Sequence, residues 1–503
     1  MTKEKQTGIW TVITSSSVGT LIEWYDFYIF GSLATILSVK FFPQDNPTIA
    51  FLNTLLTFAA GFIVRPFGAL VFGRLGDIVG RKYTFLVTLI LMGGSTFLIG
   101  LIPSYETIGY AAPLLVLLMR LVQGLALGGE YGGAATYVAE HSPSNRRGFY
   151  TSWIQTTATL GLFVSLVVIL LTRTTMGEES FRDWGWRVPF LLSSILVGVS
   201  IFIRLKMNES PVFAKLKKEG KTSTNPLKES FGKKENLKMV LLALFGAAMG
   251  QGVIWYTGQF YAMSFIQKTC NIDHVQVNYI IVFSLLLGTP FFVFFGWLSD
   301  KIGRKWIMLA GMLLGVLFYR PIYTAMFNLA DLEKKTEVAE LYNIERELSA
   351  WEEDPAKQVA TITTARTYSD STVVKEVRRE LDGKPFGDAV KGTILSSSGF
   401  WGMVLLIFIQ VIFVTMVYGP IAAFLVELFP TRIRYTSMSL PYHIGNGIFG
   451  GLTPAIATRF FEDSKTAANP SGDPLAGLTY VIIVAAVCFV IGAIYLKNSY
   501  SNE

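Results

Sequence analysis

The sequence is poor in charge, histidine and cysteine for its length. Charged residues make up 16% of its 503 residues, whereas about a quarter is usual for a soluble protein. Its three histidines are scattered and form no His-Glu-x-x-His motif, so nothing indicates the metal set of an enzyme. The two cysteines, Cys270 at a loop edge and Cys488 in an apolar run, predict inert thiols rather than a disulfide framework.

Long apolar runs are abundant instead. Hydrophobic residues make up 51% of the chain, and its mean hydropathy is +0.45. A helix needs about 20 mostly apolar residues to cross the hydrocarbon of a membrane, and such runs are too long for barrel strands. Twelve runs reach this length: 12–39, 49–72, 84–102, 111–138, 149–171, 187–205, 239–267, 276–298, 306–327, 397–427, 436–458 and 475–497. The sequence therefore predicts an all-α membrane protein.

The spans fall into two groups of six. We predict an N-terminal half over 1–205, a linker over 206–238 and a C-terminal half over 239–503. The linker carries nine lysines against four glutamates, which is typical of a cytoplasmic strap beside anionic headgroups. Residues 1–10 are polar and precede a long apolar run, so we expect a retained first span rather than a cleaved signal.

A repeated turn supports the two halves. Gly-Arg-Leu-Gly-Asp-Ile-Val-Gly-Arg-Lys at 73–82 returns as Gly-Trp-Leu-Ser-Asp-Lys-Ile-Gly-Arg-Lys at 296–305. Each block is too polar for hydrocarbon, and its Asp is expected to cap the helix that follows it. We expect these turns to act as gates through Asp77, Arg81, Asp300 and Arg304. The alternative is simple turn capping with a marker of membrane side.

A second repeat, Glu-x-x-Pro-Ser/Thr-x-x-Arg, follows the fourth and tenth spans. It adds Glu140 and Arg147 in the first half, and Glu427 and Arg434 in the second, to the expected gate. The two copies of this second repeat are separated by more residues than the two copies of the first repeat. The second half must therefore contain an insertion between the two motifs. The polar segment 328–396, between spans nine and ten, has about the required size.

The insertion allows two interpretations. Leu341, Ile344, Leu348 and Trp351 fall at helical spacing, as do Val373, Val377 and Leu381. A small charged helical lid or hairpin is one expectation, and a mobile solvated loop is the other.

The distribution of Lys and Arg predicts the orientation. With the N-terminus in the cytoplasm, the short inner segments hold most of these residues and the short outer loops hold few. Both termini and both Gly-Arg-Lys turns are then cytoplasmic, and 328–396 is extracytoplasmic. The basic residues flank the membrane spans, so we expect no nucleic-acid partner.

Three further motifs carry a resemblance to a known family. They are Gly-Thr-Leu-Ile-Glu-Trp-Tyr-Asp-Phe at 19–27, Arg-Leu-Val-Gln-Gly-Leu-Ala-Leu-Gly-Gly-Glu at 120–130 and Phe-Pro-Thr-Arg-Ile-Arg-Tyr at 429–435. With the repeated turn, they resemble the metabolite:proton symporter family of the major facilitator superfamily, over all but 328–396. The resemblance implies the twelve-helix major facilitator fold, with spans one and four on a central cavity. Known members carry proline and betaine, α-ketoglutarate, shikimate or citrate.

Ionisable groups inside spans are the first candidates for the site. Charges at mid-bilayer are costly and tend to face partners or a water-filled cavity. Glu23 and Asp26 share a face of span one, and Arg120 lies in span four. Arg65 and Glu130 are expected either in the cavity or in a gate or packing pair. Arg320 is expected to extend outward from span nine.

Polar and aromatic side chains of the second half complete the candidate set. Those expected to line a substrate site, or else to join helices, are Tyr442, His443, Asn446, Gln251, Trp255, Tyr256 and Gln259. His443 is a further candidate for a proton role. Trp24, Tyr25, Trp255 and Tyr256 would suit a quaternary ammonium through cation–π contacts, or else simply pack.

These residues predict a proton-coupled symporter, not an enzyme, that works by alternating access. We expect it to import a small organic solute, in first place a carboxylate metabolite, with a betaine- or proline-type zwitterion as the alternative. Protons are the expected coupling ion, without other cofactors, in a monomer of the inner membrane. A transporter-derived sensor is a further alternative. It would normally add a signalling tail, and only about six residues follow the last span.

Overall fold

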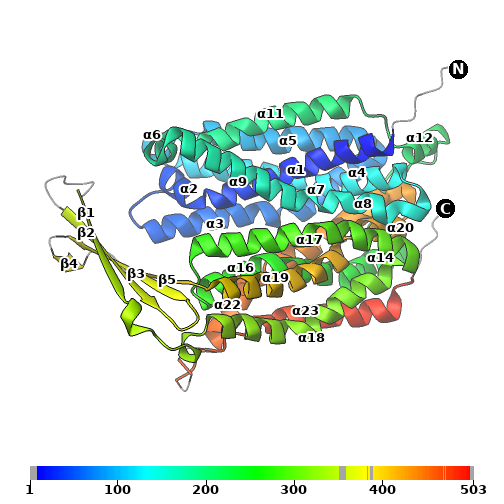
Figure 1. Ribbon diagram of the computed structural model, residues 1–503. Coiled ribbons are helices and arrows are strands. Elements are labelled where there is room, and N and C mark those ends of the chain that lie inside the picture. The colour runs from blue at the N-terminus through cyan, green and yellow to red at the C-terminus, as the bar shows by residue number, and fades with distance from the viewer. Residues whose placement is uncertain are drawn as a thin grey trace.

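The helices of the chain form two bundles that lie side by side (Figure 1). The structure, a computed structural model, describes residues 8–350, 358–381, 383–385, 389–467, 469–470 and 472–498. Helix α1 begins and helix α23 ends at the same end of the bundles, and a β-sheet projects from the opposite end (Figure 1). We call these two ends the termini end and the sheet end.

The first bundle comes from the N-terminal half. Its helices are α1 (Ile9–Ser32), α2 (Ala34–Phe41), α3 (Pro47–Ile63), α4 (Arg65–Ile78), α5 (Arg81–Leu101), α6 (Tyr105–Ile108), α7 (Ala111–His141), η1 (Ser144–Arg146), α8 (Arg147–Gln155), α9 (Thr157–Met176), α10 (Glu178–Ser180), η2 (Phe181–Gly185) and α11 (Arg187–Leu205). The linker follows with the short helices α12 (Pro211–Lys218) and α13 (Pro226–Gly232).

The second bundle repeats the arrangement with more π-helical turns. It contains α14 (Lys234–Ala243), η3 (Leu244–Ala248), α15 (Met249–Tyr256), η4 (Thr257–Tyr261), α16 (Ala262–Ser264), η5 (Phe265–Thr269), α17 (His274–Ile302), α18 (Arg304–Ala330), α19 (Ser397–Tyr418), α20 (Ile421–Leu428), η8 (Thr431–Ile433), α21 (Arg434–His443), η9 (Ile444–Gly450), α22 (Thr453–Asp463) and α23 (Leu478–Tyr495). Segments η3, η4, η5 and η9 are π-helical, so the seventh and eleventh spans are the irregular ones of this half. Such segments are frequent at functional sites.

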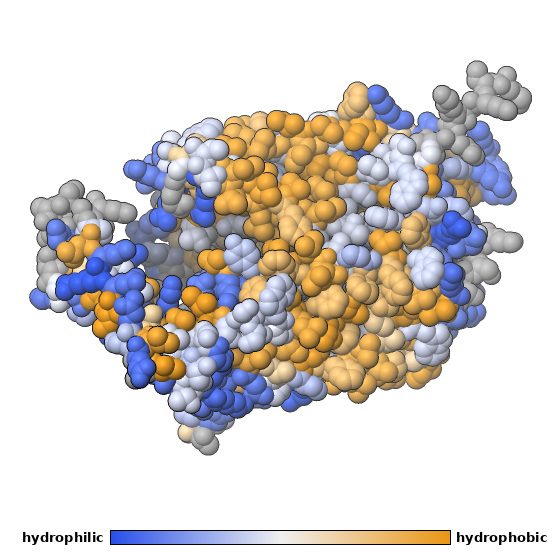
Figure 2. Space-filling model, viewed as in Figure 1, coloured by the Kyte–Doolittle hydropathy of each residue, from blue (hydrophilic) through white to orange (hydrophobic). Residues whose placement is uncertain are grey.

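Helical segments lie over each of the twelve predicted spans. Among the described residues, ten helices are long and apolar enough to cross a membrane. The first and eleventh spans are not among these ten, and both carry ionisable residues and interruptions. Figure 2 shows the consequence on the surface: hydrophobic residues form a broad band across the middle, and hydrophilic residues gather at both ends. The helical membrane fold is thus confirmed.

Local sequence signals set where several helices begin. The Asn46 side chain accepts a hydrogen bond from Ile49 N at 3.1 Å, and Pro47 takes the first position of α3. Asp273 caps α17 in the same way, and Ser396 caps α19. The second span breaks before Pro66, which explains why α3 and α4 are separate helices.

The insertion is a five-stranded antiparallel sheet, not a helix or an irregular loop. After the short helices η6 (Leu332–Lys334) and η7 (Ala339–Leu341), it contains β1 (Asn343–Ala350), β2 (Gln358–Thr367), β3 (Val373–Leu381), β4 (Lys384–Pro385) and β5 (Val390–Ile394). Strand β2 pairs with β1 and β3, and β3 also pairs with β4 and β5. Strand β1 therefore forms one edge of the sheet.

The helical expectation for this segment was wrong for a geometric reason. Residues four apart share a face of a helix, but they also share a face of a strand. Ile344 and Leu348 lie four apart in β1, and Val373 and Val377 lie four apart in β3. The Val, Ile and Thr content of β2 favours strands. Trp351 lies outside the described residues.

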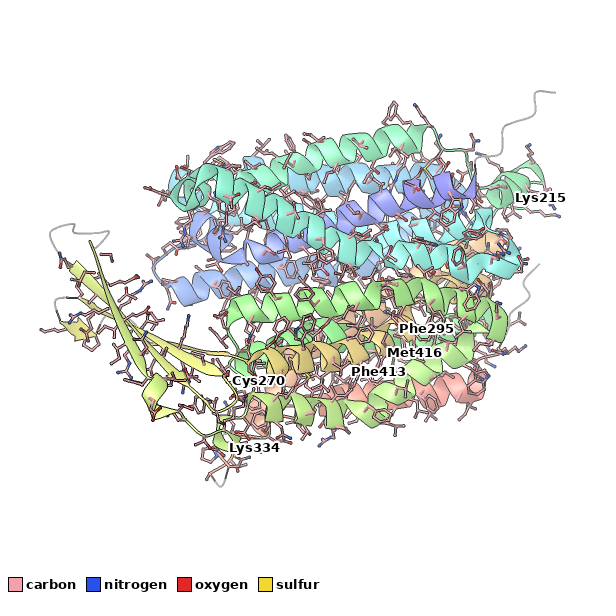
Figure 3. The ribbon with its side chains drawn as sticks, viewed as in Figure 1. Lys215, Cys270, Phe295, Lys334, Phe413 and Met416 are labelled. Atoms are coloured by element: carbon pink, nitrogen blue, oxygen red, sulfur yellow. The ribbon has the colours of Figure 1, made fainter. Side chains whose placement is uncertain are left out.

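Strand β5 attaches the sheet to the connection between α17 and the helix before it. Thr393 N donates to Asn271 O at 2.8 Å, and Asp273 N donates to Thr393 O at 2.9 Å. The Gln276 side chain exchanges two hydrogen bonds with the Leu395 backbone, at 2.8 and 3.0 Å. Figure 3 labels Cys270 at this junction, where burial raises the pKa of its thiol to about 12.

Deleting 335–390 and joining the ends with a short flexible linker should leave a folded protein. The deletion removes β1–β4 but keeps residues 391–395, whose backbone carries the attachment. We expect a thermal midpoint in detergent close to that of the intact chain. As control, a deletion extended through 395 should lower it, because the hydrogen bonds to Asn271, Asp273 and Gln276 are lost. Equal thermal midpoints for the two deletions would contradict a stabilising attachment of β5 to the start of α17.

Candidate functional site

The two halves meet at the termini end through a carboxylate that caps a helix of the other half. Asp77, at the end of α4, accepts hydrogen bonds from Tyr435 N at 3.3 Å and Thr436 N at 2.8 Å. These are the second and third residues of α21, where free N–H groups and the helix dipole favour an anion. The Thr436 hydroxyl adds a third hydrogen bond at 2.7 Å.

Asp300 makes the same contact in the opposite direction. Its two carboxylate oxygens accept from Gly148 N and Phe149 N, both at 2.7 Å. These N–H groups again belong to the second and third residues of their helix, α8. Gly148 and Gly296 face each other here, and a Cβ on either would meet the backbone of the other, which is why glycine is required. Each repeated turn thus provides an aspartate that caps a helix of the other half: Asp77 caps α21, and Asp300 caps α8.

Ion pairs surround both caps. Arg81 lies 3.0 Å from Asp77 and 3.6 Å from Glu140, and Arg434 of the second half lies 3.0 Å from Glu140. On the other side, Arg304 lies 2.9 Å from Asp300. It binds Glu427 through two hydrogen bonds of 2.7 Å, and Arg147 of the first half lies 3.9 Å from Glu427. All eight predicted gating residues therefore lie in two related clusters.

One expectation for the turns was wrong. Asp77 does not cap α5, the helix that follows it, because its carboxylate is already bound to α21. Asp300 likewise does not cap α18, because its carboxylate is bound to α8. Glu209, beyond α11, takes that role for α5 by accepting from Arg81 N at 3.2 Å and Lys82 N at 3.3 Å. Lys82 in turn donates to Leu205 O at the end of α11.

A small cavity lies between the two halves, midway along the bundles. Its volume is about 30 Å³, close to the space of one water molecule. Both halves contribute to its lining, which consists of Thr20, Glu23, Trp24, Arg65, Tyr131, Ile154, Gln155, Trp255, Tyr256, Tyr418, Tyr442, His443, Asn446 and Gly447. We call it the central pocket. It contains Glu23, Arg65, Tyr256, Tyr442, His443 and Asn446 from the predicted set.

Glu23 and Arg65 are the charged groups of this pocket. Glu23 is 8% exposed and has no hydrogen-bond or ion-pair partner among the described residues. The Arg65 guanidinium carbon lies 4.3 Å from the centroid of the Phe62 ring. Its buried Nε has no hydrogen-bond partner among the residues that the structure describes. An acid and a base that line one cavity without pairing to each other are available to a solute.

Tyrosine hydroxyls and amides form the remaining polar wall. Tyr131 and Tyr442 stack across the halves with ring centroids 3.7 Å apart, and the Tyr418 and Tyr442 hydroxyls lie 2.8 Å apart. Gln155 Nε2 donates to the Tyr131 hydroxyl at 2.8 Å. Asn446 exchanges two hydrogen bonds with Gln251, at 2.9 and 3.1 Å, which fixes its amide beside the pocket.

Asp26 and Arg120 lie outside the lining of the central pocket. Asp26 is 1% exposed and accepts from the Thr96 hydroxyl at 2.7 Å. Arg120 is held over the Phe30 and Phe58 rings at 4.5 and 4.9 Å, and it donates to the Gln123 carbonyl. Gln123 Nε2 donates to Thr96 Oγ1 at 2.8 Å. The acid and the guanidinium are therefore joined through two other side chains rather than by a direct ion pair.

Glu130 lies in an ion pair inside the first half. Its Oε1 is 2.6 Å from Arg204 Nη2, and its Oε2 accepts from the Thr88 hydroxyl at 2.9 Å. Gly19 lies directly beneath this pair, where a Cβ would strike the guanidinium. Glu130 thus fits the packing interpretation. The sequence did not single out Arg204, because its place at the end of span six is typical of a membrane-flanking charge.

Aromatic side chains separate the central pocket from a larger cavity toward the sheet end. Trp24 lies 5.2 Å from Trp255, and Phe27 lies 6.1 Å from Phe260, between ring centroids, so both pairs join the two halves. Beyond them is a cavity of about 480 Å³, lined by Phe27, Tyr28, Gly31, Ser32, Phe58, Leu162, Leu166, Ile169, Arg173, Gln259, Phe260, Met263, Asn278, Ile281, Val282 and Leu285. We call it the vestibule. Of the predicted residues, Gln259 lines it, while Tyr25 donates to Pro189 O and packs in the first half.

Comparisons with known proteins identify this arrangement. A family model described as "Sugar (and other) transporter" matches residues 11–244. The inner membrane metabolite transport protein YhjE of Escherichia coli (strain K12) is 32% identical over 89% of this chain and 86% of its own length. The proline/betaine transporter of Salmonella typhimurium is 30% identical over 97% and 83%, respectively. The alpha-ketoglutarate permease of Escherichia coli (strain K12) is 29% identical over 96% and 92%.

Solved structures support the same fold. The proton:xylose symporter XylE, bound to 6-bromo-6-deoxy-D-glucose, matches with a TM-score of 0.67 at 15% identity, over 98% of each chain. In both chains two helical halves lie side by side, and in this chain reciprocal helix caps close one end around a central pocket. The chain belongs to the major facilitator superfamily and is similar to its metabolite transporters. It is a transporter, not an enzyme.

Replacing Asp77 or Asp300 by Asn should open the termini end without abolishing solute binding. The amide still accepts a hydrogen bond but loses the charge that a helix N-terminus stabilises, at a cost of about 1–2 kcal/mol. The equilibrium constant for closure of this end should then fall roughly five- to thirty-fold. Spin labels at the termini end, on α4 and α21, would measure the change as a longer distance.

Asp463→Asn serves as the matched control. Asp463 forms its ion pair with Arg459 on the exposed surface of α22, so the same chemical change should leave the distance unaltered. An unchanged distance in Asp77→Asn and Asp300→Asn would reduce the caps to fixed turns.

Proposed function

We propose that this chain is a proton-coupled symporter that imports a small organic carboxylate by alternating access. The observation that carries the proposal is the central pocket, where Glu23 and Arg65 face a cavity between the halves without pairing to each other. Unpaired charges inside a membrane are costly and mark pathways for ions and substrates. Glu23 supplies a site for the proton, and Arg65 supplies one for the carboxylate.

The closed termini end sets the direction of the cycle. We place this end in the cytoplasm of a cell with an inner membrane, because Lys and Arg concentrate in its loops. Solute and proton enter through the vestibule from outside, past the aromatic pairs. Binding favours a rocking of the halves that releases both caps and opens the pocket inward. A membrane potential of 100 mV adds about 2.3 kcal/mol per charge moved.

Arg65, rather than Arg120, takes the carboxylate in this proposal. Arg65 lines the pocket, whereas Arg120 donates to Gln123 and packs between two phenylalanine rings. The proton is the coupling ion and no other cofactor takes part. The chain acts as a monomer, since one chain contributes both halves of the pocket.

A zwitterion of the betaine or proline type is the second candidate solute. Trp24 and Trp255 lie beside Glu23, and aromatic faces with a carboxylate suit a quaternary or secondary ammonium. Arg65 would hold the carboxylate of either solute. A panel of dicarboxylates, monocarboxylates and betaines in one uptake assay separates the two candidates.

Uptake into proteoliposomes should follow an imposed pH gradient. An inward proton gradient should drive accumulation, and a protonophore should abolish it, because carboxylates are the coupling groups. A sodium gradient alone should have no effect. Sodium-driven uptake that survives the protonophore would overturn proton coupling.

Glu23→Gln should bind and exchange solute but fail to concentrate it. The amide resembles the protonated acid and cannot release a proton, so the cycle loses its coupling. Counterflow and net accumulation in the same vesicles measure the two steps. Glu462→Gln, at an exposed surface pair with Lys465, is the control and should behave as wild type. If both Glu23→Gln and Asp26→Asn still accumulate solute with the proton gradient, span one does not carry the proton.

Arg65→Ala should weaken solute binding itself. Loss of a desolvated partner of the carboxylate costs about 2–5 kcal/mol, a decrease in affinity of at least roughly thirty-fold. Arg320→Ala is the control, because Arg320 lies exposed on α18 and contacts the Thr479 hydroxyl at 3.4 Å. Near-normal affinity in Arg65→Ala would move the carboxylate site elsewhere.

A further inference from the structure

The buried side chains between Asp26 and Arg120 form a row of hydrogen bonds with a single direction. The row runs from Arg120 through Gln123 and Thr96 to Asp26, and crosses from α7 through α5 to α1. All four side chains are at most 3% exposed. None of the four lines the central pocket.

The donors of this row are fixed by chemistry. A guanidinium has donors only, so the Gln123 group that faces Arg120 must be its carbonyl oxygen. The Gln123 amide nitrogen then faces Thr96 Oγ1 and donates to it at 2.8 Å. Thr96 therefore accepts from Gln123 and has one proton of its own to donate.

That proton has two acceptors in reach. Thr96 Oγ1 lies 2.7 Å from Asp26 Oδ2 and 3.1 Å from Met92 O in the preceding turn of α5. An ionised Asp26 only accepts, so the proton of Thr96 is directed to it. A protonated Asp26 can donate to Thr96 Oγ1, and the hydroxyl proton then turns to Met92 O. The orientation of Thr96 thus depends on whether Asp26 carries a proton.

At each end of the row one polar atom is left without a hydrogen bond. Among the described residues, Asp26 Oδ1 and Arg120 Nε are buried without a hydrogen-bond partner. The row therefore holds the acid and the guanidinium apart and leaves each with unsatisfied hydrogen-bonding capacity. Unsatisfied groups of this kind are costly and persist where a second arrangement satisfies them.

We infer that Thr96 and Gln123 are positioning residues that transmit the protonation state of Asp26 to the guanidinium of Arg120. The inference rests on the proposed proton coupling through span one and adds two residues to it. When Asp26 is ionised, three donors in line stabilise the anion. When Asp26 is protonated, the Thr96 proton turns to Met92 O, the row no longer ends on an anion, and its hold on Arg120 weakens.

Few ionisable groups act on Asp26 besides this row. Glu23 and Tyr25 lie on α1 itself, and Arg120 reaches it from α7. The other helices packed on α1 are α2, α5, α8, α9 and α11, and α5 contributes the uncharged Thr96 to the surroundings of Asp26. A pH response that changes with Thr96 can therefore be assigned to the row.

Thr96→Val tests the inference, with Thr96→Ser as the matched control. Valine keeps the β-branched shape without the hydroxyl, and serine keeps the hydroxyl. The loss of one hydrogen bond to a charged carboxylate should move the midpoint of proton-dependent uptake by about one pH unit toward higher pH. Solute affinity should stay unchanged. Gln123→Met should shift the midpoint in the same direction, because it also interrupts the row.

A second measurement needs no transport. The protonated-carboxyl band in infrared difference spectra of the purified protein is assigned to Asp26 by its loss in Asp26→Asn. Its titration should shift in Thr96→Val and not in Thr96→Ser. Equal titrations in wild type and Thr96→Val would overturn the inference, and so would equal shifts in the Val and Ser variants. A shifted band in a protein without proton-driven uptake would leave the row standing and overturn the proposed function instead.

Discussion

The closed state of this transporter depends on two carboxylates that complete helices of the opposite half. The first N–H groups of a helix have no partner within the helix and need one from elsewhere. For α8 and α21 that partner comes from across the interface, as Asp300 and Asp77. A separation of the halves at this end would remove both acceptors at once, so water would have to replace them at both helices together. The two caps therefore stabilise a single all-or-none closure of the termini end.

Much of the fold could be predicted because membrane spans depend on local composition. Apolar length indicated twelve spans, and the two repeats indicated the halves and all eight residues of the two ion-pair clusters at the termini end. The target of Asp77 could not be predicted, since pairing with α21 joins residues far apart in the sequence. The spacing of apolar residues alone could not identify the inserted sheet either. Apolar residues four positions apart share a face in a helix and also in a strand. Strand propensity in β2 was the signal that distinguished them.

The candidate site shows a similar division. Glu23, Arg65, Tyr442, His443 and Asn446 could be predicted as polar residues inside apolar runs, and the structure gathers them at one pocket. Tyr131, Gln155 and Tyr418 were missed because a single tyrosine or glutamine in a span is usually a packing residue. Asp26 and Arg120 were also predicted as site residues, but neither lines the central pocket. Their connection through Thr96 and Gln123 depends on side-chain geometry that residue spacing does not contain.

The attachment of β5 makes the sheet a lever arm. Its base is joined through Asn271 and Asp273 to the connection that follows the irregular seventh span, and its far edge is β1. A small rotation at the base produces a larger displacement at that edge, as with any rigid arm. A displacement at the base can therefore be followed by a probe on β1, whose residues are absent from the linings of the central pocket and the vestibule.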